Sequence, residues 1–558
     1  MSAAPNDALG AGLPETPDHN GAFPRLDEEQ LERFRRLGRV RAVEPGEILF
    51  APGERGDAFF VVESGSVAIV QGYGAEDRII AVHGAHRFLG ELSLIVGQRI
   101  YLTGAVCEAG AVIEVPLQAL WGVVAEDKAM SDLILGAFMA RRALLIGLGT
   151  GIKVIGSRFS SDSRRLREFL ARNQMPYIWI DLEDDDQAEG LLSGLGVAAA
   201  ETPVVIASDG QILRNPNSAE LGEALGLGTR APPPVLCDVI VVGAGPAGLG
   251  AALYAASEGL SVQGVEATAP GGQAGTSSRI ENYLGFPAGI SGHELTQKAF
   301  VQAGKFGARL TTPAEAVALH SEPGRHEIEL SNGIRVTGRT VVIATGAQYR
   351  RPQVARLDEF EGGGVYYAAT QAEAQLCSGD PVAVIGGGNS AGQAAMFLSE
   401  TSPCRLLIRG GDLGKSMSRY LVDQVERNDA IEVCAHSELV ELHGERELVA
   451  MTIRDNRSDE HTRIPATALF VFVGASPHTE WLAGQLETDK GGFLLTGREL
   501  DGDQLAEFEG EPPLFLETSR PGIFAVGDVR SGSIKRVASA VGEGSMAVRL
   551  IHERLAAP

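Results

Sequence analysis

Two segments of this chain repeat one pattern: a short apolar strand, a glycine-rich turn and the start of a helix. Residues 239–242 precede the first turn at 243–248, and residues 382–385 precede the second turn at 386–391. A strand that turns sharply into a helix presents free backbone N–H groups to a phosphate, and glycine permits a close approach. The repeat therefore predicts two doubly wound α/β units, each with a site for a dinucleotide.

The residue at the end of the following strand distinguishes the two units. Glu266 lies 23 positions after Gly243. Arg409 lies the same 23 positions after Gly386. A carboxylate accepts hydrogen bonds from the hydroxyls of an unphosphorylated ribose, whereas an arginine suits a 2′-phosphate. We therefore expect FAD in the first unit and NADPH in the second, with Lys415 close enough in sequence to assist.

The bulk properties exclude several classes of protein. A length of 558 residues is too great for one core, so we expect several domains. The net charge of −24 disfavours nucleic acid as a partner, and no apolar run approaches the roughly 20 residues of a membrane span. The five cysteines show no C-x-x-C spacing and the 11 histidines no clustered spacing, which argues against a disulfide framework and a metal site. Residues 1–24 have no basic or apolar stretch, so we expect a disordered lead and a cytoplasmic protein.

Two further segments precede the glycine-rich turns. Residues 25–148 are predicted to form an antiparallel β-barrel or jelly roll that ends in a helix over 130–145. The expected strands include residues 47–50, 58–62, 66–70 and 112–115. Residues 149–229 alternate strand and helix, which predicts a compact α/β domain. The linker 230–235 contains three consecutive prolines and separates this domain from the rest of the chain.

From Cys237 onward the chain resembles the low-molecular-weight thioredoxin reductases. The shared motifs are Pro270-Gly271-Gly272-Gln273, Glu281-Asn282, Ala344-Thr345-Gly346-Ala347 and residues 472–477, 522–529 and 536–538. The resemblance implies a Rossmann-type FAD-binding domain over 236–354 and 484–558, an NADPH-binding domain inserted at 355–483, and a homodimer. At Val537 the family has a glutamine that contacts the flavin.

The turns and the resemblance together give two sets of expected cofactor-binding residues. The FAD set is Gly243, Gly245, Pro246, Ala247, Gly248, Glu266, Gly272, Gln273, Asn282, Ala344, Thr345, Gly346, Gly527, Asp528, Arg536, Val537 and Ala538. The NADPH set is Gly386, Gly388, Asn389, Ser390, Ala391, Arg409 and Lys415. No side chain is assigned as a catalytic acid or base, because the flavin supplies the chemistry and the protein supplies orientation.

The redox-active cysteine pair of that family is missing here. The family has a Cys-Ala-Thr-Cys-Asp run just ahead of the second glycine turn. Counting back without gaps places Ala369 and Ala372 on the two cysteines, and a shift of one residue places Ala368 and Gln371 there. Neither alignment leaves a sulfur, and disulfide exchange needs a thiolate. Cys377, downstream and alone, is interpreted as a buried apolar residue.

The middle segment shows the same loss. Residues 149–229 resemble the glutaredoxin and thioredoxin-like folds, with Ser160 and Ser163 at the C-x-x-C positions and Thr202-Pro203 at the position of the family's cis-proline. Serine cannot form a disulfide, so this domain is expected to be an inert docking domain.

Residues 26–145 resemble cyclic-nucleotide-binding domains. The shared features are Pro45-Gly46-Glu47, Gly65 and residues 89–94. In the family, Gly90-Glu91 would open the phosphate-binding cassette, and a later arginine takes the cyclic phosphate. That arginine position holds Ile100, and Arg99 comes one residue early. Two interpretations stay open: Arg99 replaces the missing cation and a cyclic nucleotide binds, or the domain is a degenerate regulatory or dimerising module.

The sequence thus predicts a multidomain oxidoreductase: a barrel with helices, a thioredoxin-like α/β domain and a double Rossmann-type flavoprotein. We expect electrons to pass from NADPH through FAD directly to dioxygen, a quinone or a small electron-carrier protein. A second hypothesis is reduction of thioredoxin-type disulfides with cysteines from a partner chain. A third is an FAD- and NADPH-binding sensor or scaffold with little turnover.

Overall fold

The computed structural model describes residues 12–54, 56–71, 78–90, 99–147, 152–173, 175–184, 188–198, 201–207, 210–227, 236–277, 280, 282–360, 364–367, 369, 371–445, 447–502, 505, 508 and 512–556. The chain divides into two compact units, and each is described by itself. Residues 1–157, 166–233 and 301–314 form the first unit, and residues 158–165, 234–300 and 315–558 form the second.

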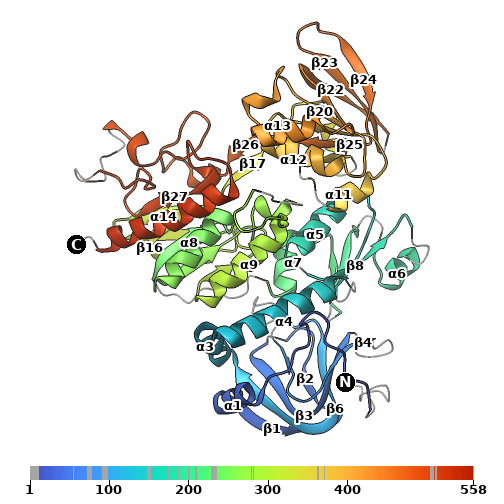
Figure 1. The fold of residues 1–558 in the computed structure, drawn as a ribbon, viewed down its shortest axis with the longest axis vertical. Helices are drawn as coiled ribbons and strands as arrows, with labels where there is room; N and C mark the ends of the chain where they lie inside the picture. Colours follow the sequence, from blue (N-terminus) through green and yellow to red (C-terminus); the bar gives the residue numbers. More distant parts are fainter. Residues whose placement is uncertain are drawn as a thin grey trace. The chain divides into compact units, whose positions relative to one another are not determined.

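The N-terminal part of the first unit is an antiparallel β-structure with helices (Figure 1). Its elements are α1 (Glu28–Leu37), β1 (Arg39–Val43), β2 (Ile48–Phe50), β3 (Ala58–Gln71), β4 (Arg78–His83), β5 (Phe88–Leu89), β6 (Thr103–Pro116), α3 (Leu117–Glu126) and α4 (Lys128–Gly147). The strands β1, β6, β3 and β4 lie side by side in that order, with β2 paired to β6 and β5 paired to β3. The strands expected at 58–62 and 66–70 are one strand, because Gly65 at φ +81° forms a bulge and does not end the pairing.

Residues 12–24 differ from the disordered lead expected over 1–24. Ala22 and Phe23 are buried, and the backbone N–H of Thr16 donates to the carbonyl of Val82 at 3.1 Å. Burial of an aromatic ring holds this segment against the β-structure.

The middle part of the first unit contains a four-stranded sheet in the order β10-β9-β7-β8. Its elements are β7 (Ile152–Gly156), α5 (Ser161–Arg172), β8 (Tyr177–Asp181), α6 (Ala188–Gly194), β9 (Val204–Ile206), β10 (Ile212–Arg214) and α7 (Ser218–Ala224). β7 and β8 are parallel, and β9 is antiparallel to both β7 and β10. Leu166 and Phe169 of α5 are buried against this sheet. The Thr202–Pro203 peptide bond is cis. β10, which is only three residues long, is absent from the sequence prediction.

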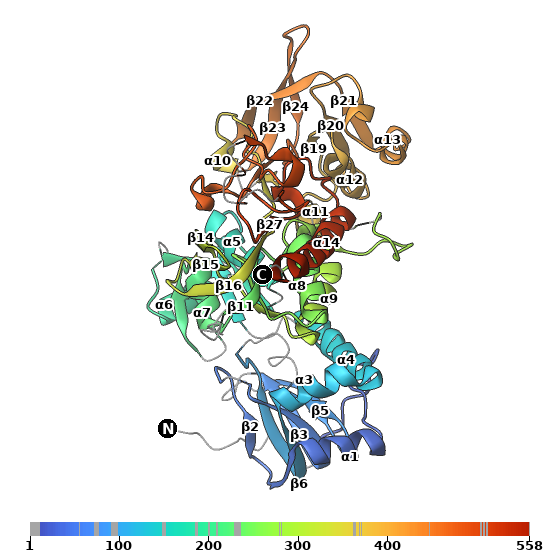
Figure 2. The ribbon, with the colours of Figure 1, turned by 90° about the vertical axis from the view of Figure 1, so that its left-hand side faces the viewer.

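The second unit begins with the strand and helix of the first glycine turn. Its elements up to the second turn are β11 (Cys237–Val242), α8 (Pro246–Ser257), β12 (Val262–Val265), α9 (Gly292–Lys305, up to residue 300), β14 (Ala316–Glu322), β15 (Arg325–Leu330), β16 (Arg335–Ile343), β17 (Ala347–Tyr349), α10 (Leu357–Phe360), β18 (Val365–Tyr366) and α11 (Gln371–Leu376). The end of α9 and β13 (Arg309–Thr311) belong to the first unit. The strands β12, β11, β16, β15 and β14 lie in that order, and β27 (Ile523–Ala525) pairs with β16. The final helix α14 (Val537–Ala556) lies beside α8 (Figures 1 and 2). Gly544 permits this approach, because a Cβ there would lie 2.2 Å from the carbonyl oxygen of Ala247.

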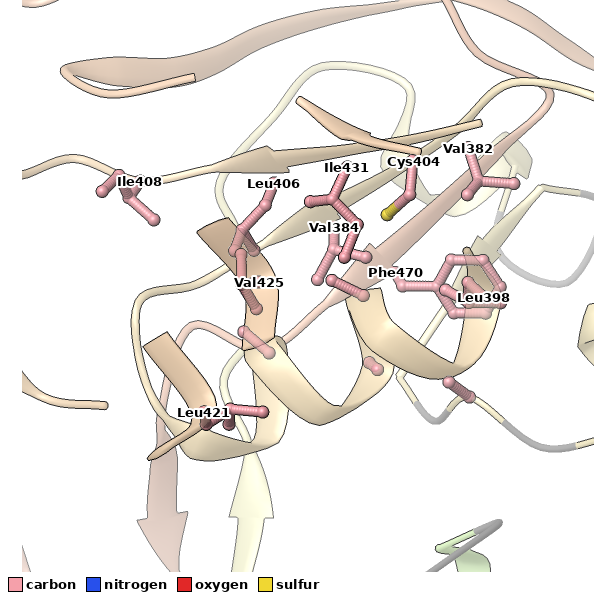
Figure 3. Packing of buried hydrophobic residues seen from close by; sticks show 14 of the residues in the cluster. Val382, Val384, Leu398, Cys404, Leu406, Ile408, Leu421, Val425, Ile431 and Phe470 are labelled. Carbon is pink, nitrogen blue, oxygen red and sulfur yellow. The ribbon is translucent and has the colours of Figure 1, made fainter. Parts of the chain in front are cut away.

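The second glycine turn belongs to a separate parallel sheet in the order β18-β25-β19-β20-β21. The elements after α11 are β19 (Val382–Ile385), α12 (Asn389–Leu398), β20 (Cys404–Leu407), α13 (Arg419–Glu426), β21 (Ile431–Cys434), β22 (Ser437–Gly444), β23 (Leu448–Asp455), β24 (His461–Pro465), β25 (Ala468–Val471) and β26 (Ala475–Pro477). β22, β23 and β24 form a small sheet of their own, next to the parallel sheet in Figure 2. Figure 3 shows α12 and α13 packed on the parallel sheet through apolar side chains of β19, β20 and β25. β17, which precedes this parallel sheet in the chain, pairs antiparallel with β26, which follows it.

Candidate functional site

The first candidate site lies at the carboxyl edge of the sheet that contains β11. β11 runs parallel to β12 and β16, and β16 runs parallel to β27, so the four strands end at the same edge. Gly243, Glu266, Ala344 and Gly527 follow these strand ends. The fold therefore brings together four parts of the chain that the sequence analysis expected at one cofactor.

Glycine is required at this edge because backbone segments meet there. A Cβ on Gly243, whose φ is +102°, would lie 2.4 Å from the carbonyl oxygen of Ala344. A Cβ on Gly248 would lie 1.8 Å from the oxygen of Gly243. At Gly245, by contrast, the nearest atom to an added Cβ is the Cα of Gly272, 3.8 Å away. A Cβ on Gly272 would lie 2.9 Å from the Cα of Gly245, so the backbones of these two glycines lie in close contact at the N-terminus of α8, where a pyrophosphate is expected.

Glu266 has a second role besides the one expected of it. Its carboxylate accepts the backbone N–H groups of Ala244 at 2.8 Å and Thr268 at 3.0 Å, which fixes the glycine turn. The carboxylate is only half-buried and keeps lone pairs for ribose hydroxyls. Thr345 donates its hydroxyl to the carbonyl of His478 at 2.8 Å, so this side chain holds the returning strand β26.

One functional residue near this edge was missed from the sequence. Glu543 of α14 accepts the backbone N–H of Gly527 at 2.7 Å and forms an ion pair with Arg530 at 2.7 Å. Both side chains of this pair are largely buried. Glu543 therefore fixes the loop that carries Asp528, and no local sequence pattern marks it.

The second candidate site lies at the glycine turn between β19 and α12. Gly386 has φ +143°, and a Cβ there would lie 2.3 Å from the carbonyl oxygen of Phe472. Gly388 is the N-cap of α12, which begins at Asn389. The Asn389 side chain accepts the backbone N–H of Ser418 at 2.7 Å. The remaining two residues of the expected turn, Ser390 and Ala391, form the first turn of α12.

The two expected cations flank this turn. A Cβ placed on Gly387 would lie 3.9 Å from the Ile408 side chain and 3.4 Å from the Ser416 hydroxyl, and Ser416 donates that hydroxyl to the Gly387 carbonyl at 2.8 Å. Arg409 and Lys415, their neighbours in the chain, are exposed. No described residue bonds the guanidinium of Arg409 or the ammonium of Lys415. Ser416 was not predicted, because its approach to the turn comes from the loop after β20.

These geometries agree with the comparisons with known proteins. A model of the pyridine nucleotide-disulphide oxidoreductases matches residues 237–544. The chain belongs to this family. It is 32% identical over 322 residues to thioredoxin reductase 1 of Saccharomyces cerevisiae, covering 55% of this chain and 95% of the yeast protein. Crystal structures of the T. acidophilum and Lactococcus lactis thioredoxin reductases, 28% and 25% identical, each align with a TM-score of 0.51 over 57% of this chain and 99% of theirs.

A second family model, of the cyclic nucleotide-binding domain, matches residues 40–127. This model and the oxidoreductase model account for the two ends of the chain, and the resemblance of the middle segment to thioredoxin-like folds stays a prediction. No helix among the described residues combines the length and apolarity needed to cross a membrane. The described residues also hold no group of three or more histidine, cysteine or carboxylate side chains placed for a metal ion.

The thioredoxin reductase family binds FAD and NADPH, and the first site of this oxidoreductase fits FAD. The Asp528 carboxylate lies half-buried at the start of a short 3-10 helix (Gly527–Val529), and burial raises its pKa. Among the described residues no donor bonds this carboxylate. The half-buried carboxylate has room for hydrogen-bond donors, and the hydroxyls of a ribityl chain are donors of the kind that would bond it.

The other expected FAD residues also belong to the second unit. Gln273 is exposed and precedes the 3-10 helix Ala274–Thr276, and Asn282 is exposed as well. Pro246 and Ala247 begin α8, and Gly346 accepts the backbone N–H of His478 at 3.1 Å. Arg536 is exposed immediately before α14, and Val537 and Ala538 are its first two residues. Lys535, which directly precedes Arg536, donates to the carbonyl of Asp528 at 3.3 Å.

The five cysteines of this oxidoreductase are free and apart. Burial raises the pKa of all five thiols, to about 11 for Cys237 and Cys377 and about 12 for Cys404. Figure 3 shows the Cys404 sulfur inside the apolar cluster with Val384 and Phe470. Thiols in such surroundings are poor nucleophiles.

The positions expected for the redox pair lie just before β19. Ala369 is buried, and Gln371 begins α11. Ala368 lies outside the described residues, and the side chain of Ala372 is not described. In the middle segment Ser160 accepts the backbone N–H of Ser163 at 3.3 Å, the bond of a helix cap.

Of the three residues expected at the N-terminal nucleotide site, the structure describes Gly90 and Arg99. Gly90 has φ +98° at the end of β5, and Glu91 lies outside the described residues. Arg99 donates its backbone N–H to the carbonyl of Leu225 at 3.4 Å, and its side chain packs on Gly226. Arg99 therefore faces the middle segment.

Proposed function

We propose that this protein is an FAD-dependent NADPH oxidoreductase that delivers electrons from the flavin to a non-dithiol acceptor: dioxygen, a quinone or a small electron-carrier protein. The observation that carries the proposal is the state of its sulfur atoms. The chain has five free thiols of raised pKa, four of them buried and Cys434 half-buried, in place of the paired cysteines of the family. At pH 7 a thiol of pKa about 11 is ionised in roughly one molecule in ten thousand.

The residues at the first edge would hold FAD. The N-terminus of α8, which Gly245 and Gly272 leave free of side chains, suits the pyrophosphate, and Glu266 suits the adenosine ribose. Asp528, supported by the bond from Gly527 to Glu543, suits the ribityl hydroxyls. When bound, FAD supplies hydride acceptance from the nicotinamide and electron release to the acceptor.

The residues at the second turn would hold NADPH. The N-terminus of α12 suits the pyrophosphate. Arg409 and Lys415 offer two exposed cations beside the turn, which suits the 2′-phosphate and favours NADPH over NADH. The homodimer and a regulatory role for the N-terminal domain remain predictions that follow from the resemblance.

The test is anaerobic mixing of the purified, FAD-loaded protein with NADPH while the visible flavin absorbance is followed. Rapid bleaching, with reoxidation by dioxygen, a soluble quinone or a ferredoxin-type carrier, supports the proposal. Disulfide-bonded thioredoxin, used as the matched acceptor, should leave the reduced flavin unchanged. A flavin that stays oxidised for minutes would indicate a binding protein, and rapid reoxidation by thioredoxin would indicate a thiol relay.

A further inference from the structure

A segment ahead of the first helix lies against the N-terminal β-structure and is held at its two ends. We call this segment, residues 15–23, the strap. At one end the Thr16 backbone N–H donates to the carbonyl of Val82 in β4 at 3.1 Å, and the Val82 N–H donates to the Thr16 hydroxyl at 2.8 Å. At the other end Phe23 is 3% exposed. Residues 17–21, between these ends, are exposed, so the strap depends on the contacts of its two ends.

The first end of the strap gives a carboxylate to a buried cation. The guanidinium of Arg87 is always charged, yet the residue is only 5% exposed. The Glu15 carboxylate lies 2.8 Å from the Arg87 Nε and accepts the backbone N–H of Gly84 at 3.1 Å. Arg87 also donates to the carbonyl of Thr16 at 2.6 Å. A buried guanidinium needs such an anion, because burial of an unpaired charge is costly.

The second end of the strap gives an aromatic ring to the same cation and to another. The centroid of the Phe23 ring lies 6.0 Å from the guanidinium carbon of Arg87 and 5.4 Å from that of Arg141 in α4. Arg141 is also 5% exposed, and it donates to the carbonyl of Ala22 at 2.5 Å. Aromatic rings attract cations at these distances, most strongly where water is excluded. The strap thus supplies an anion and a ring to two buried guanidinium groups.

The strap fills its place incompletely. A cavity of about 60 Å³ adjoins Phe23, which forms part of its wall. His83 lies in the same wall, and its Nδ1 makes no hydrogen bond with any described residue although the side chain is 2% exposed. The Phe23 ring packs edge-on against this imidazole at 5.5 Å between centroids. The cavity alone is too small for a ring, but a ring in place of Phe23 would have the space of both, and a polar substituent on it would reach the unsatisfied imidazole.

We propose that this region binds a molecule with an aromatic ring and an anionic group, and that the strap is its internal occupant. The ring takes the place of Phe23 beside Arg87 and Arg141, and the anionic group takes the place of the Glu15 carboxylate. Ligand and strap use the same contacts, so binding lifts the strap. These cations are not at the position from which the related domains bind a cyclic phosphate, which holds Ile100. The site belongs to the first unit and does not depend on the proposed oxidoreductase activity.

The experiment compares three probes on the full-length, FAD-loaded protein. Phenyl phosphate has a ring and an anion, phenol has the ring without the charge, and inorganic phosphate has the anion without the ring. By titration calorimetry we expect phenyl phosphate to bind at least about tenfold more tightly than either of the others, because a charge-assisted hydrogen bond in a buried site has an effect of this size. Cyclic AMP, added as a competitor, distinguishes two sources of such a ligand: displacement of phenyl phosphate assigns the site to nucleotides, and no displacement assigns it to smaller aromatic acids.

Three variants test whether the strap competes with the ligand. Glu15→Gln weakens the hold of the strap on Arg87 and should bind phenyl phosphate roughly tenfold more tightly than wild type, because the site is vacant more often. Glu29→Gln removes the same charge from an exposed position on α1 and should leave the affinity unchanged. The double variant Glu15→Gln/Arg87→Gln leaves neither member of the ion pair buried alone, and it should bind phenyl phosphate no more tightly than phenol.

Hydrogen–deuterium exchange shows whether the strap lifts. The backbone N–H of Thr16 donates to Val82, and that of Phe23 donates to the Asp18 carboxylate at 2.7 Å, so both are protected while the strap is in place. Saturating phenyl phosphate should speed exchange across residues 15–23 several-fold. Unchanged exchange of the strap on binding, equal affinities of wild type and Glu15→Gln for phenyl phosphate, or equal affinities for phenyl phosphate and phenol would each overturn the proposal.

Discussion

Arg409→Ala should remove much of the preference for NADPH over NADH. Arg409 follows β20, and the side chain of its neighbour Ile408 lies 3.9 Å from where a Cβ on Gly387 of the second glycine turn would be. Its guanidinium is exposed and is bonded by no described residue, so the substitution breaks no internal ion pair. The substitution should therefore change the binding of the nucleotide and leave the fold intact.

The expected loss in kcat/KM for NADPH follows from the exposure of the Arg409 guanidinium. A hydrogen bond to a charged group contributes about 1.5–3 kcal/mol, and solvent screening at an exposed guanidinium places this one at the low end. About 1.5 kcal/mol is roughly a tenfold loss in kcat/KM for NADPH. NADH has no 2′-phosphate, so its kcat/KM should change less than twofold. High salt should shrink the wild-type preference, because the contact is exposed.

The assay is stopped-flow reduction of the bound flavin by each nucleotide under anaerobic conditions, at low and high salt. Arg463→Ala is the matched control, because Arg463 is an exposed arginine on β24, which belongs to the separate small sheet. It should leave both kcat/KM values unchanged. An unaltered NADPH to NADH ratio in Arg409→Ala, or a wild type that prefers NADH, would refute the assignment of the second site.

Three further substitutions test the first site and the N-terminal unit. Asp528→Asn should weaken FAD binding yet stabilise the FAD-free protein at neutral pH. Burial raises the pKa of Asp528, so the wild type loses stability as pH rises through that raised pKa, whereas the variant does not. If the melting temperatures of the two FAD-free proteins differ by the same amount at every pH from acid to neutral, this account of Asp528 is contradicted. Gly245→Ala should fold, because its Cβ would meet the Cα of Gly272 at an ordinary 3.8 Å, but it should lose FAD, because the Cβ occupies the N-terminus of α8 where the pyrophosphate must approach. Gly542→Ala, with open space on α14, should retain the flavin, and equal flavin content in both proteins would contradict this. Gly226→Ala should melt several degrees below Gly210→Ala, since both have positive φ but only the first places a Cβ 2.2 Å from Arg99; coincident melting temperatures would count against the contact.

The two glycine turns and the strand ends beside them were predictable from the sequence because they depend on local geometry. A strand, a glycine turn and a helix fix where Gly243 and Gly386 must lie, and the next strand end fixes Glu266 and Arg409. These features need no knowledge of distant contacts.

The parts that were not predicted depend on contacts between distant segments. Glu543 supports Gly527 across 16 residues, and Ser416 reaches Gly387 across 29. Gly65 was interpreted as a break between strands, but pairing with β6 continues on both sides of its bulge. The three-residue strand β10 has too few residues for an alternating pattern, and it forms by pairing with β9.

The central claim is that electrons leave the flavin with no sulfur in between. The most direct measurement is anaerobic flavin reduction by NADPH, followed by reoxidation with a quinone, in a variant that replaces all five cysteines with alanine or serine. Provided the variant retains FAD, both rates should stay within about twofold of wild type. A variant whose flavin is still reduced by NADPH but no longer passes electrons to the acceptor would contradict the account.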